Sequence, residues 1–287
     1  MRKRHSVRAY LFLSPFLVFF IMVIVYPVIS GVILSFFGQR GAKMWFVGIK
    51  NYASVLADQK FWGSFGMPVF LLLVQIPLMI ILGIFIAFLF ERVKGSSVYR
   101  LIFYLPYALP GVIAGILWSY MFSKSMSPFV PLFEALGFGK VELITNGSLP
   151  FILLVIILWE WTGYTALLLY STLVSLPPEY AEAAQIDGAT RFQIAIHIKI
   201  PLLKDTIILL LIFNSIGAIQ VFNEPKMLGG LITLPPNFTP AMYIYNEAFS
   251  YGAFTYAIAM GLVLAAVIFI ISFFFMKSSV KELAVNA

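Results

Sequence analysis

The sequence predicts an all-α integral membrane protein with six transmembrane helices. Hydrophobic residues make up 61% of the 287 residues and charged residues only 11%, against about 45–50% and about 25% in soluble domains. The apolar residues gather in stretches of about 20, which is the length of helix that crosses the bilayer core. These runs are longer than the alternating segments of about ten residues that a transmembrane β-barrel uses.

The six predicted spans are spread along the whole chain. The first follows Arg2, Lys3 and Arg4, but its apolar run is too long for a signal peptide and has no clear cleavage site, so we expect an uncleaved helix with a kink at Pro27. The fifth is the weakest, because polar residues interrupt it, and we expect a break near Asn223. The spans are Tyr10–Ser35, Phe65–Phe90, Tyr99–Phe122, Leu149–Leu173, Thr206–Val221 extended by a few residues, and Phe254–Met276.

Basic residues predict that both termini lie in the cytoplasm, because Lys and Arg are enriched in cytoplasmic loops. The expected organisation is a cytoplasmic segment 1–9, a transmembrane permease domain 10–276 and a cytoplasmic tail 277–287. This orientation places 12 of the 19 basic residues inside: Arg2, Lys3, Arg4, Arg8, Arg92, Lys94, Arg100, Arg191, Lys199, Lys204, Lys277 and Lys281.

Composition also excludes several kinds of chemistry. The chain has no cysteine, and its two histidines, His5 and His197, lie far apart, so neither a thiolate site nor a metal site is expected. The stretch Gly137–Lys140 lacks the spacing of a phosphate-binding loop. We therefore expect no cofactor on this chain, no catalytic residues and no nucleic-acid partner, and we assign the net charge of +7 to the cytoplasmic loops.

The longest polar segment, 175–201, lies between the fourth and fifth spans and predicts two short cytoplasmic helices. Pro178 suits a first helical turn, and Gly188 suits a helix end that needs left-handed dihedral angles. Thr190 followed by Gln193 is typical of a capping box at the start of the second helix. We expect Pro201 to end that helix before the fifth span.

The same segment resembles the signature loop of binding-protein-dependent ABC importer permeases. Flanking stretches, among them Arg8–Pro15, Val47–Tyr52 and Tyr104–Pro110, are similar to the carbohydrate-uptake (maltose-type) branch. In that family the loop 177–201 is a coupling helix that docks on a separate ATPase. The resemblance assigns coupling roles to Glu179, Tyr180, Glu182, Ala183, Ala184, Asp187, Gly188, Ala189 and Pro201.

The resemblance also implies the function and the partners. The chain is expected to be the membrane subunit of an ATP-driven importer in the bacterial cell membrane, passing a sugar or oligosaccharide by alternating access. The partners would be a second permease, two ATP-binding subunits that use ATP and Mg, and an extracytoplasmic solute-binding protein. Two alternatives remain at this point, namely a secondary transporter driven by an ion gradient, and a member of the same family that carries glycerol phosphate or another small polar solute.

Polar residues inside spans are the candidates for substrate contact, because they are costly in lipid. Glu160 and Tyr164 share one helix face beside Trp161. A carboxylate next to aromatic rings suits a sugar, although helix–helix contact or an interfacial aromatic belt would also explain these residues. By resemblance, Asn214 and Gly217 fall at sugar-contact positions of the fifth span. The predicted substrate site is Glu160, Trp161, Tyr164, Asn214, Gly217 and Gln220.

Overall fold

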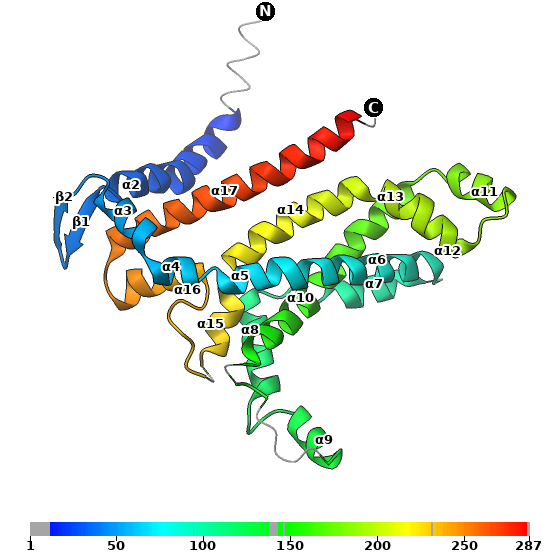
Figure 1. The fold of residues 1–287 in the computed structure, drawn as a ribbon, viewed down its shortest axis with the longest axis horizontal. Helices are drawn as coiled ribbons and strands as arrows, with labels where there is room; N and C mark the ends of the chain where they lie inside the picture. The colour runs from blue at the N-terminus through cyan, green and yellow to red at the C-terminus, as the bar shows by residue number, and fades with distance from the viewer. Residues whose placement is uncertain (1–11, 94, 138–142, 146, 231, 286–287) are drawn as a thin grey trace, which may run out of the picture. The chain divides into compact units, whose positions relative to one another are not determined.

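The computed structural model describes residues 12–285 except 94, 138–142, 146 and 231. These described residues are mainly helical and contain one two-stranded sheet (Figure 1). They divide into two compact units, Met1–Trp62 with Tyr243–Val267, and Gly63–Met242 with Ile268–Ala287. The predicted segment 1–9, the first residues of the first span and most of the stretch Gly137–Lys140 lie outside the described residues.

Five helices in the described part of the chain are long and apolar enough to cross a membrane. They correspond to the first, second, fourth, fifth and sixth predicted spans. The prediction of an all-α integral membrane protein is therefore confirmed. The last helix, α17 (Phe254–Val285), continues well beyond the predicted end at Met276, so most of the predicted tail is helical. The five are Phe12–Leu34, Gln59–Arg92, Leu149–Ser175, Lys204–Leu228 and Phe254–Phe274.

The third predicted span, Tyr99–Phe122, is not one continuous helix. Its residues form α7 (Ser96–Tyr104) and the short apolar helix α8 (Gly111–Phe122), with turns between them. Pro106 and Pro110 lie at this interruption. Because proline has no N–H and restricts the residue before it, two prolines four residues apart disfavour a continuous helix. The length of the apolar run predicted a span without showing this break.

Three of the prolines in helical segments, Pro27, Pro77 and Pro201, each follow a five-residue π-helical turn. These turns are η1 (Ile21–Val25), η2 (Leu71–Gln75) and η3 (Ala195–Lys199), and each ends two residues before Pro27, Pro77 or Pro201. The residue just before each proline donates its N–H to the carbonyl five residues back. A wider turn of this kind accommodates a proline ring that would clash with the carbonyl four residues back.

The prediction that Pro201 ends the second helix of the polar segment is therefore wrong. The helical path runs from α12 (Arg191–Ile194) through η3 into α13 (Ile200–Leu202). It then turns at Leu203 and enters α14 (Lys204–Gln220). The π turn lets the chain pass the proline without stopping, and the first span passes Pro27 in the same way.

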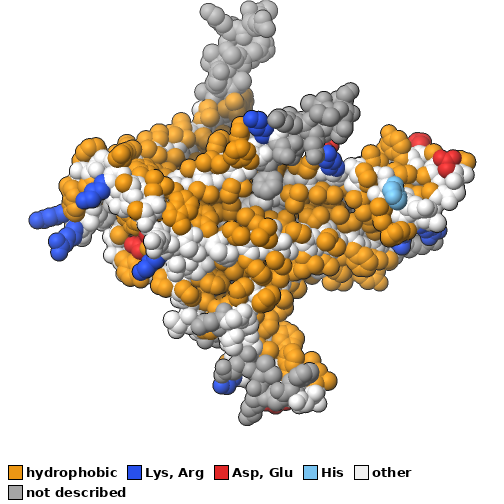
Figure 2. Space-filling model, in the orientation of Figure 1, with side chains coloured by type: hydrophobic (Ala, Val, Ile, Leu, Met, Phe, Trp, Pro, Cys, Tyr) orange, Lys and Arg blue, Asp and Glu red, His pale blue; other side chains and the backbone are white. Residues whose placement is uncertain are grey.

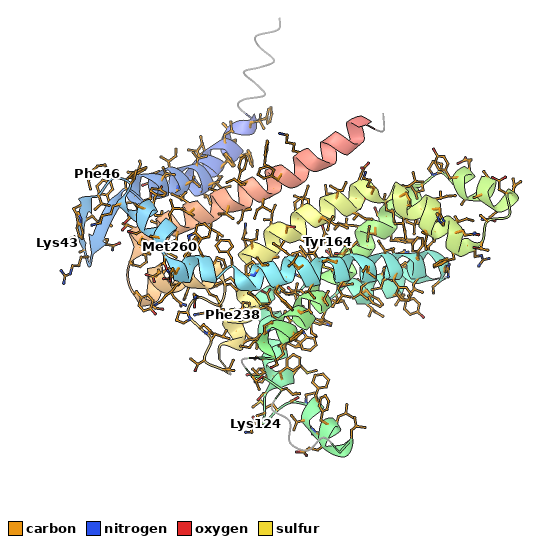
Figure 3. All side chains as sticks on the ribbon, viewed as in Figure 1. Lys43, Phe46, Lys124, Tyr164, Phe238 and Met260 are labelled. Atoms are coloured by element: carbon orange, nitrogen blue, oxygen red, sulfur yellow. The ribbon has the colours of Figure 1, made fainter. Side chains whose placement is uncertain are left out.

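The first unit joins the start of the chain to residues near its end. It holds α2 (Tyr26–Leu34), α3 (Lys50–Ala57), most of α4 (Gln59–Gly63), the hairpin β1 (Phe37–Arg40) and β2 (Lys43–Phe46), part of α16 (Pro240–Tyr245), η4 (Asn246–Ser250) and the first part of α17. The strands pair antiparallel, with Phe37 opposite Phe46 and Arg40 opposite Lys43. Lys43 and Phe46 are labelled on the hairpin in Figure 3. The hairpin was not predicted.

Asp58 ties the two parts of the first unit together. Its Oδ1 accepts the backbone N–H groups of Lys60 at 2.8 Å and Phe61 at 3.2 Å, which are in the first turn of α4. Its Oδ2 accepts the hydroxyls of Tyr243 at 2.9 Å and Tyr256 at 3.1 Å. One carboxylate thus begins a helix and also holds residues that lie far apart in the sequence.

The second unit is built around α10 (Leu149–Ser175). This helix packs against α6 (Ile76–Arg92), α7 and α14 (Figure 1). Gly83 of α6 lets α10 approach closely, because a Cβ at this position would lie 2.8 Å from Cγ2 of Thr165. Outward side chains such as Ile81 and Phe85 are exposed, and Figure 2 shows hydrophobic side chains predominating over α6 and α14, as expected for surfaces that face lipid.

A second tight helix pair joins α8 to α15 (Asn223–Leu228). Gly111 and Gly115 lie one helical turn apart on α8 and face α15. A Cβ on Gly111 would overlap a carboxyl oxygen of Glu224, and a Cβ on Gly115 would lie 2.8 Å from Cβ of Met227. This is the small-xxx-small arrangement that brings membrane helices into close contact. It fixes α15 next to the break that follows α14.

Candidate functional site

A cavity of about 540 Å³ lies within the second unit, inside the size range of small-molecule sites. Residues from α10, from α14 and from the break between α14 and α15 line most of it. The break, at Val221 and Phe222, confirms the interruption expected near Asn223. Irregular backbone inside a membrane protein is tolerated where it lines a cavity. Five of the six predicted substrate residues line this cavity: Trp161, Tyr164, Asn214, Gly217 and Gln220.

Three aromatic rings form one wall of the cavity. The ring of Tyr107 stacks on Tyr164 with centroids 4.3 Å apart and an interplanar angle of 12°. The ring of Trp161 meets Tyr107 edge-on at 5.1 Å. Figure 3 labels Tyr164 among the helices of the second unit. Flat aromatic faces with polar edges can pack on the C–H surface of a sugar ring while their hydroxyls form hydrogen bonds.

Glu160, the sixth predicted residue, does not line the cavity. Its side chain is only 4% exposed, and one carboxyl oxygen has no hydrogen-bond partner among the described residues. Its carboxyl group contacts that of Glu224, which is 8% exposed and does line the cavity. An acidic residue is therefore present in the cavity wall, as predicted, but it is Glu224 and not Glu160.

The predicted site lacked Tyr107, Glu224 and Gln75, all of which line the cavity. Tyr107 comes from the turns between α7 and α8, and Gln75 is the last residue of η2. Each of the three lies beside a proline-related irregularity, namely Pro106, Pro77 or Pro225. Prolines inside or directly after the predicted spans were the sequence signal that could have identified them.

The second candidate site is the polar segment between α10 and α14. It begins with α11 (Glu179–Ile186), and Glu179 and Glu182 lie in the first turn of this helix, where carboxylates suit the helix dipole. Gly188 has φ of +82°. The N–H of Gly188 donates to the carbonyl of Gln185 at 3.0 Å, and the N–H of Ala189 donates to that of Ala184 at 2.9 Å. This is a Schellman end, so the predicted glycine turn is confirmed.

The second short helix begins as the sequence predicted. The backbone N–H of Thr190 donates to Oε1 of Gln193 at 2.8 Å, and the N–H of Gln193 donates to Oγ1 of Thr190 at 3.3 Å. Both halves of a capping box are therefore formed. The connection between the two helices is accordingly fixed by a left-handed glycine and a reciprocal cap rather than by a loose loop.

Most residues predicted to couple to an ATPase are on the surface. Glu179, Tyr180, Glu182, Ala183, Asp187, Gly188 and Pro201 are exposed, while Ala184 and Ala189 are partly buried. Large apolar side chains surround them: Ile186 is 86% exposed and Phe192 is 72% exposed. Glu91 at the end of α6 forms an ion pair with Lys199 of η3, which connects this segment to the helical core. The result is an anchored segment with an apolar outer surface.

Comparison with known proteins identifies the family. Residues 79–281 match the binding-protein-dependent transport system inner membrane component family. The chain is 33% identical over 238 residues to the trehalose/maltose transport system permease protein MalF of Thermococcus litoralis, covering 80% of this chain and 79% of that protein. It is 29% identical to the arabinooligosaccharides transport system permease protein AraP of Bacillus subtilis, covering 94% and 88%.

The fold agrees with this relationship. The crystal structure of a bacterial alginate ABC transporter, in complex with its alginate pentasaccharide-bound periplasmic protein, contains a chain with a TM-score of 0.81 and 22% identity. The match covers 97% of this chain and 96% of that one. A second solved structure, of a bacterial ABC transporter involved in the import of the acidic polysaccharide alginate, contains a chain with a TM-score of 0.79 and 21% identity, covering 98% of this chain and 99% of that one.

The cavity between membrane helices and the matching sequence define a multi-pass membrane protein of the transport class. The chain belongs to the family of binding-protein-dependent transport system inner membrane components. It is a permease subunit of an ABC importer in the carbohydrate-uptake (maltose-type) branch, which confirms the predicted resemblance. It is a transport subunit and not an enzyme.

Proposed function

We propose that this permease imports a sugar or oligosaccharide through the cavity between α10, α14 and α15. The supporting observation is the cavity itself, which combines a stacked aromatic wall with amide side chains. Several relatives carry saccharides according to their names, among them arabinooligosaccharides, trehalose and maltose. Trp161, Tyr164, Asn214, Gly217 and Gln220 form this substrate site, and Glu160 supports it from behind through Glu224.

The proposed topology has six crossings with both termini in the cytoplasm. The third crossing consists of α7 and α8 with the irregular turn between them. The segments 1–9 and 277–287 are then cytoplasmic, and residues 10–276 form the permease domain. This arrangement places the segment 177–201 on the cytoplasmic side, as the distribution of basic residues requires. The membrane is the bacterial cell membrane.

The segment 177–201 is the proposed coupling element, and it docks on a separate ATP-binding subunit. This role is supported by its exposed apolar residues, its fixed Gly188 turn and its ion pair with α6. Such a segment can move as a rigid body together with the ATP-binding subunit on which it docks. The complete importer contains a second permease, two ATP-binding subunits and the binding protein. ATP and Mg are used by the ATP-binding subunits, and this chain binds no cofactor. Closing of these subunits moves the spans between inward-open and outward-open states.

The test uses the complete importer in proteoliposomes with ATP inside. Substitutions Glu182→Ala and Gly188→Ala should lower ATP-driven sugar uptake severalfold while membrane insertion and amount remain unchanged. At Gly188 the effect comes from the positive φ alone, since a Cβ there would meet nothing within 4 Å.

Two variants serve as matched controls. Gly41 also has a positive φ of +60° and an open surrounding, so Gly41→Ala introduces similar strain outside the segment. Glu134→Ala removes an exposed carboxylate from α9 (Phe129–Ala135) by the same substitution as Glu182→Ala. Both should keep full uptake. Normal uptake by the Glu182 and Gly188 variants would contradict the coupling role.

A further inference from the structure

The cavity differs from an anion-binding site in its charged groups. Glu224 is the one charged-type side chain among the described residues that line it, and Lys, Arg and His do not occur in that lining. Lys226 lies two residues beyond Glu224 on α15 but is not part of the cavity wall. The other polar side chains of the lining carry amides, tyrosine hydroxyls or an indole N–H, and they are Gln75, Asn214, Gln220, Asn223, Tyr107, Tyr164 and Trp161.

The position of Glu224 is set by its surroundings. A side chain at Gly111 would overlap its carboxyl oxygen, so the missing Cβ provides the space that the carboxyl group occupies. Glu160 contacts it from α10 and is itself almost fully buried, with one carboxyl oxygen lacking a partner among the described residues. One end of the cavity is therefore acidic, with the carboxyl group of Glu224 in its wall and that of Glu160 behind it.

This arrangement opposes a negatively charged cargo. A uronate, sulfonate or phosphate would leave water without meeting a cation in the cavity wall, and an unpaired charge is costly to desolvate. It would also approach two carboxyl groups. An uncharged saccharide meets no such barrier, because its hydroxyls can donate to a carboxyl oxygen and exchange hydrogen bonds with the amides.

We infer that the cavity selects uncharged saccharides and that Glu224 is the residue that discriminates against anionic ones. This inference rests on the proposed sugar-import function and makes its substrate class more specific. The fold by itself does not exclude charged cargo, since the similar chain of the alginate transporter belongs to an importer of an acidic polysaccharide. The discrimination must therefore come from the side chains of the cavity. It disfavours glycerol phosphate, the alternative cargo left open by the sequence.

The first experiment compares cargo classes in the complete importer with its binding protein in proteoliposomes. The neutral probes are maltotriose, arabinotriose and lactose, and the anionic probes are trigalacturonate, alginate trisaccharide and glycerol 3-phosphate. At least one neutral saccharide should accumulate with ATP, at least tenfold above any anionic probe. Accumulation of an anionic saccharide instead would overturn this inference and leave sugar import intact. Accumulation of no saccharide would overturn both.

The second experiment tests Glu224 with the neutral saccharide that accumulates fastest. Glu224→Gln keeps the size and hydrogen-bonding capacity of the side chain, whereas Glu224→Lys reverses the charge. We expect a KM for uptake that rises moderately in the first variant and at least tenfold in the second. Inhibition of uptake by the matched anionic saccharide should appear in Glu224→Lys and not in the wild type. Glu134→Gln is the control. Unchanged KM and unchanged inhibition in Glu224→Lys would overturn the assignment.

Discussion

The ring of Tyr107 lies parallel to that of Tyr164, with centroids 4.3 Å apart. The two residues belong to different parts of the chain, since Tyr107 lies in the turns after α7 and Tyr164 lies in the middle of α10. The stacked pair thus packs an irregular segment against α10, and both rings line the cavity. This contact connects the shape of the substrate site to the break in the third span.

Removing the stacked ring should weaken substrate binding. For Tyr107→Ala we expect a KM for sugar uptake about tenfold higher, because an aromatic pair contributes about 0.5–1.5 kcal/mol beyond area burial and 1.4 kcal/mol corresponds to tenfold. Tyr107→Phe keeps the stacking and should change KM about threefold or less. Concentration-dependent uptake into proteoliposomes measures both. Equal effects of Ala and Phe would show that the hydroxyl, and not the stacking, is what matters.

Local features were predictable from the sequence. The capping box at Thr190 and the left-handed end at Gly188 depend on residues within a few positions, and both formed as predicted. The continuation of the helix past Pro201 was not predictable from such local patterns. A proline disfavours a continuing α-helix because its ring clashes with the carbonyl four residues back, and the π turn at Ala195–Lys199 removes that clash.

Only part of the cavity lining was predictable from the sequence, because some of its residues follow breaks in the helices. Trp161 and Tyr164 lie on one face of a long regular helix, so helical spacing places them together. Tyr107 and Glu224 reach the same cavity from segments whose direction changes at a break. Periodicity gives no information on the direction after a break, and only tertiary contacts such as Glu224 with Gly111 determine it.

The close contact between Gly163 of α10 and α7 leads to a prediction on stability. A Cβ on Gly163 would overlap the backbone carbonyl oxygen of Phe103, and a backbone atom cannot move aside as a flexible side chain can. Gly163→Ala should therefore lower stability by about 1–3 kcal/mol or displace α7. Thermal unfolding in detergent measures the change. Gly261→Ala is the control, since a Cβ at Gly261 meets nothing within 4 Å; an equal loss in both variants would contradict the packing argument.

Asp58 gives a prediction on pH. Burial raises the pKa of its carboxyl group, but hydrogen bonds from Tyr243, Phe61, Tyr256 and Lys60 outweigh this, so its pKa lies below the ordinary value. Burial, followed by the hydrogen bond to Asp58, raises the pKa of Tyr243, so its hydroxyl stays a donor at neutral pH. A lowered folded-state pKa means that Asp58 contributes its full stability above its unfolded-state pKa of about 3.9. That contribution is lost as the pH falls through the lower folded-state pKa.

Asp58→Asn should accordingly lower the unfolding temperature at pH 7, corresponding to about 1–3 kcal/mol for lost charge-assisted hydrogen bonds. The gap between variant and wild type should narrow below about pH 4, because Asp58 of the unfolded wild-type chain takes up a proton there before the folded carboxylate does. Thermal unfolding in detergent between pH 7 and pH 3 measures this gap. Asp187→Asn, at an exposed position, should show little loss at either pH. A gap that stays constant across this range would contradict the ionic role of Asp58.

The exposed apolar side chains of the segment 177–201 predict where the ATP-binding subunit docks. Ile186 is 86% exposed at the end of α11, next to the Gly188 turn. Ile186→Asp should reduce co-purification of the ATP-binding subunit severalfold, because a carboxylate would have to be desolvated in an apolar contact. Ile49 is 73% exposed outside this segment, so Ile49→Asp makes the same change without affecting co-purification. Equal recovery of the ATP-binding subunit with both variants would place the docking surface elsewhere on the chain.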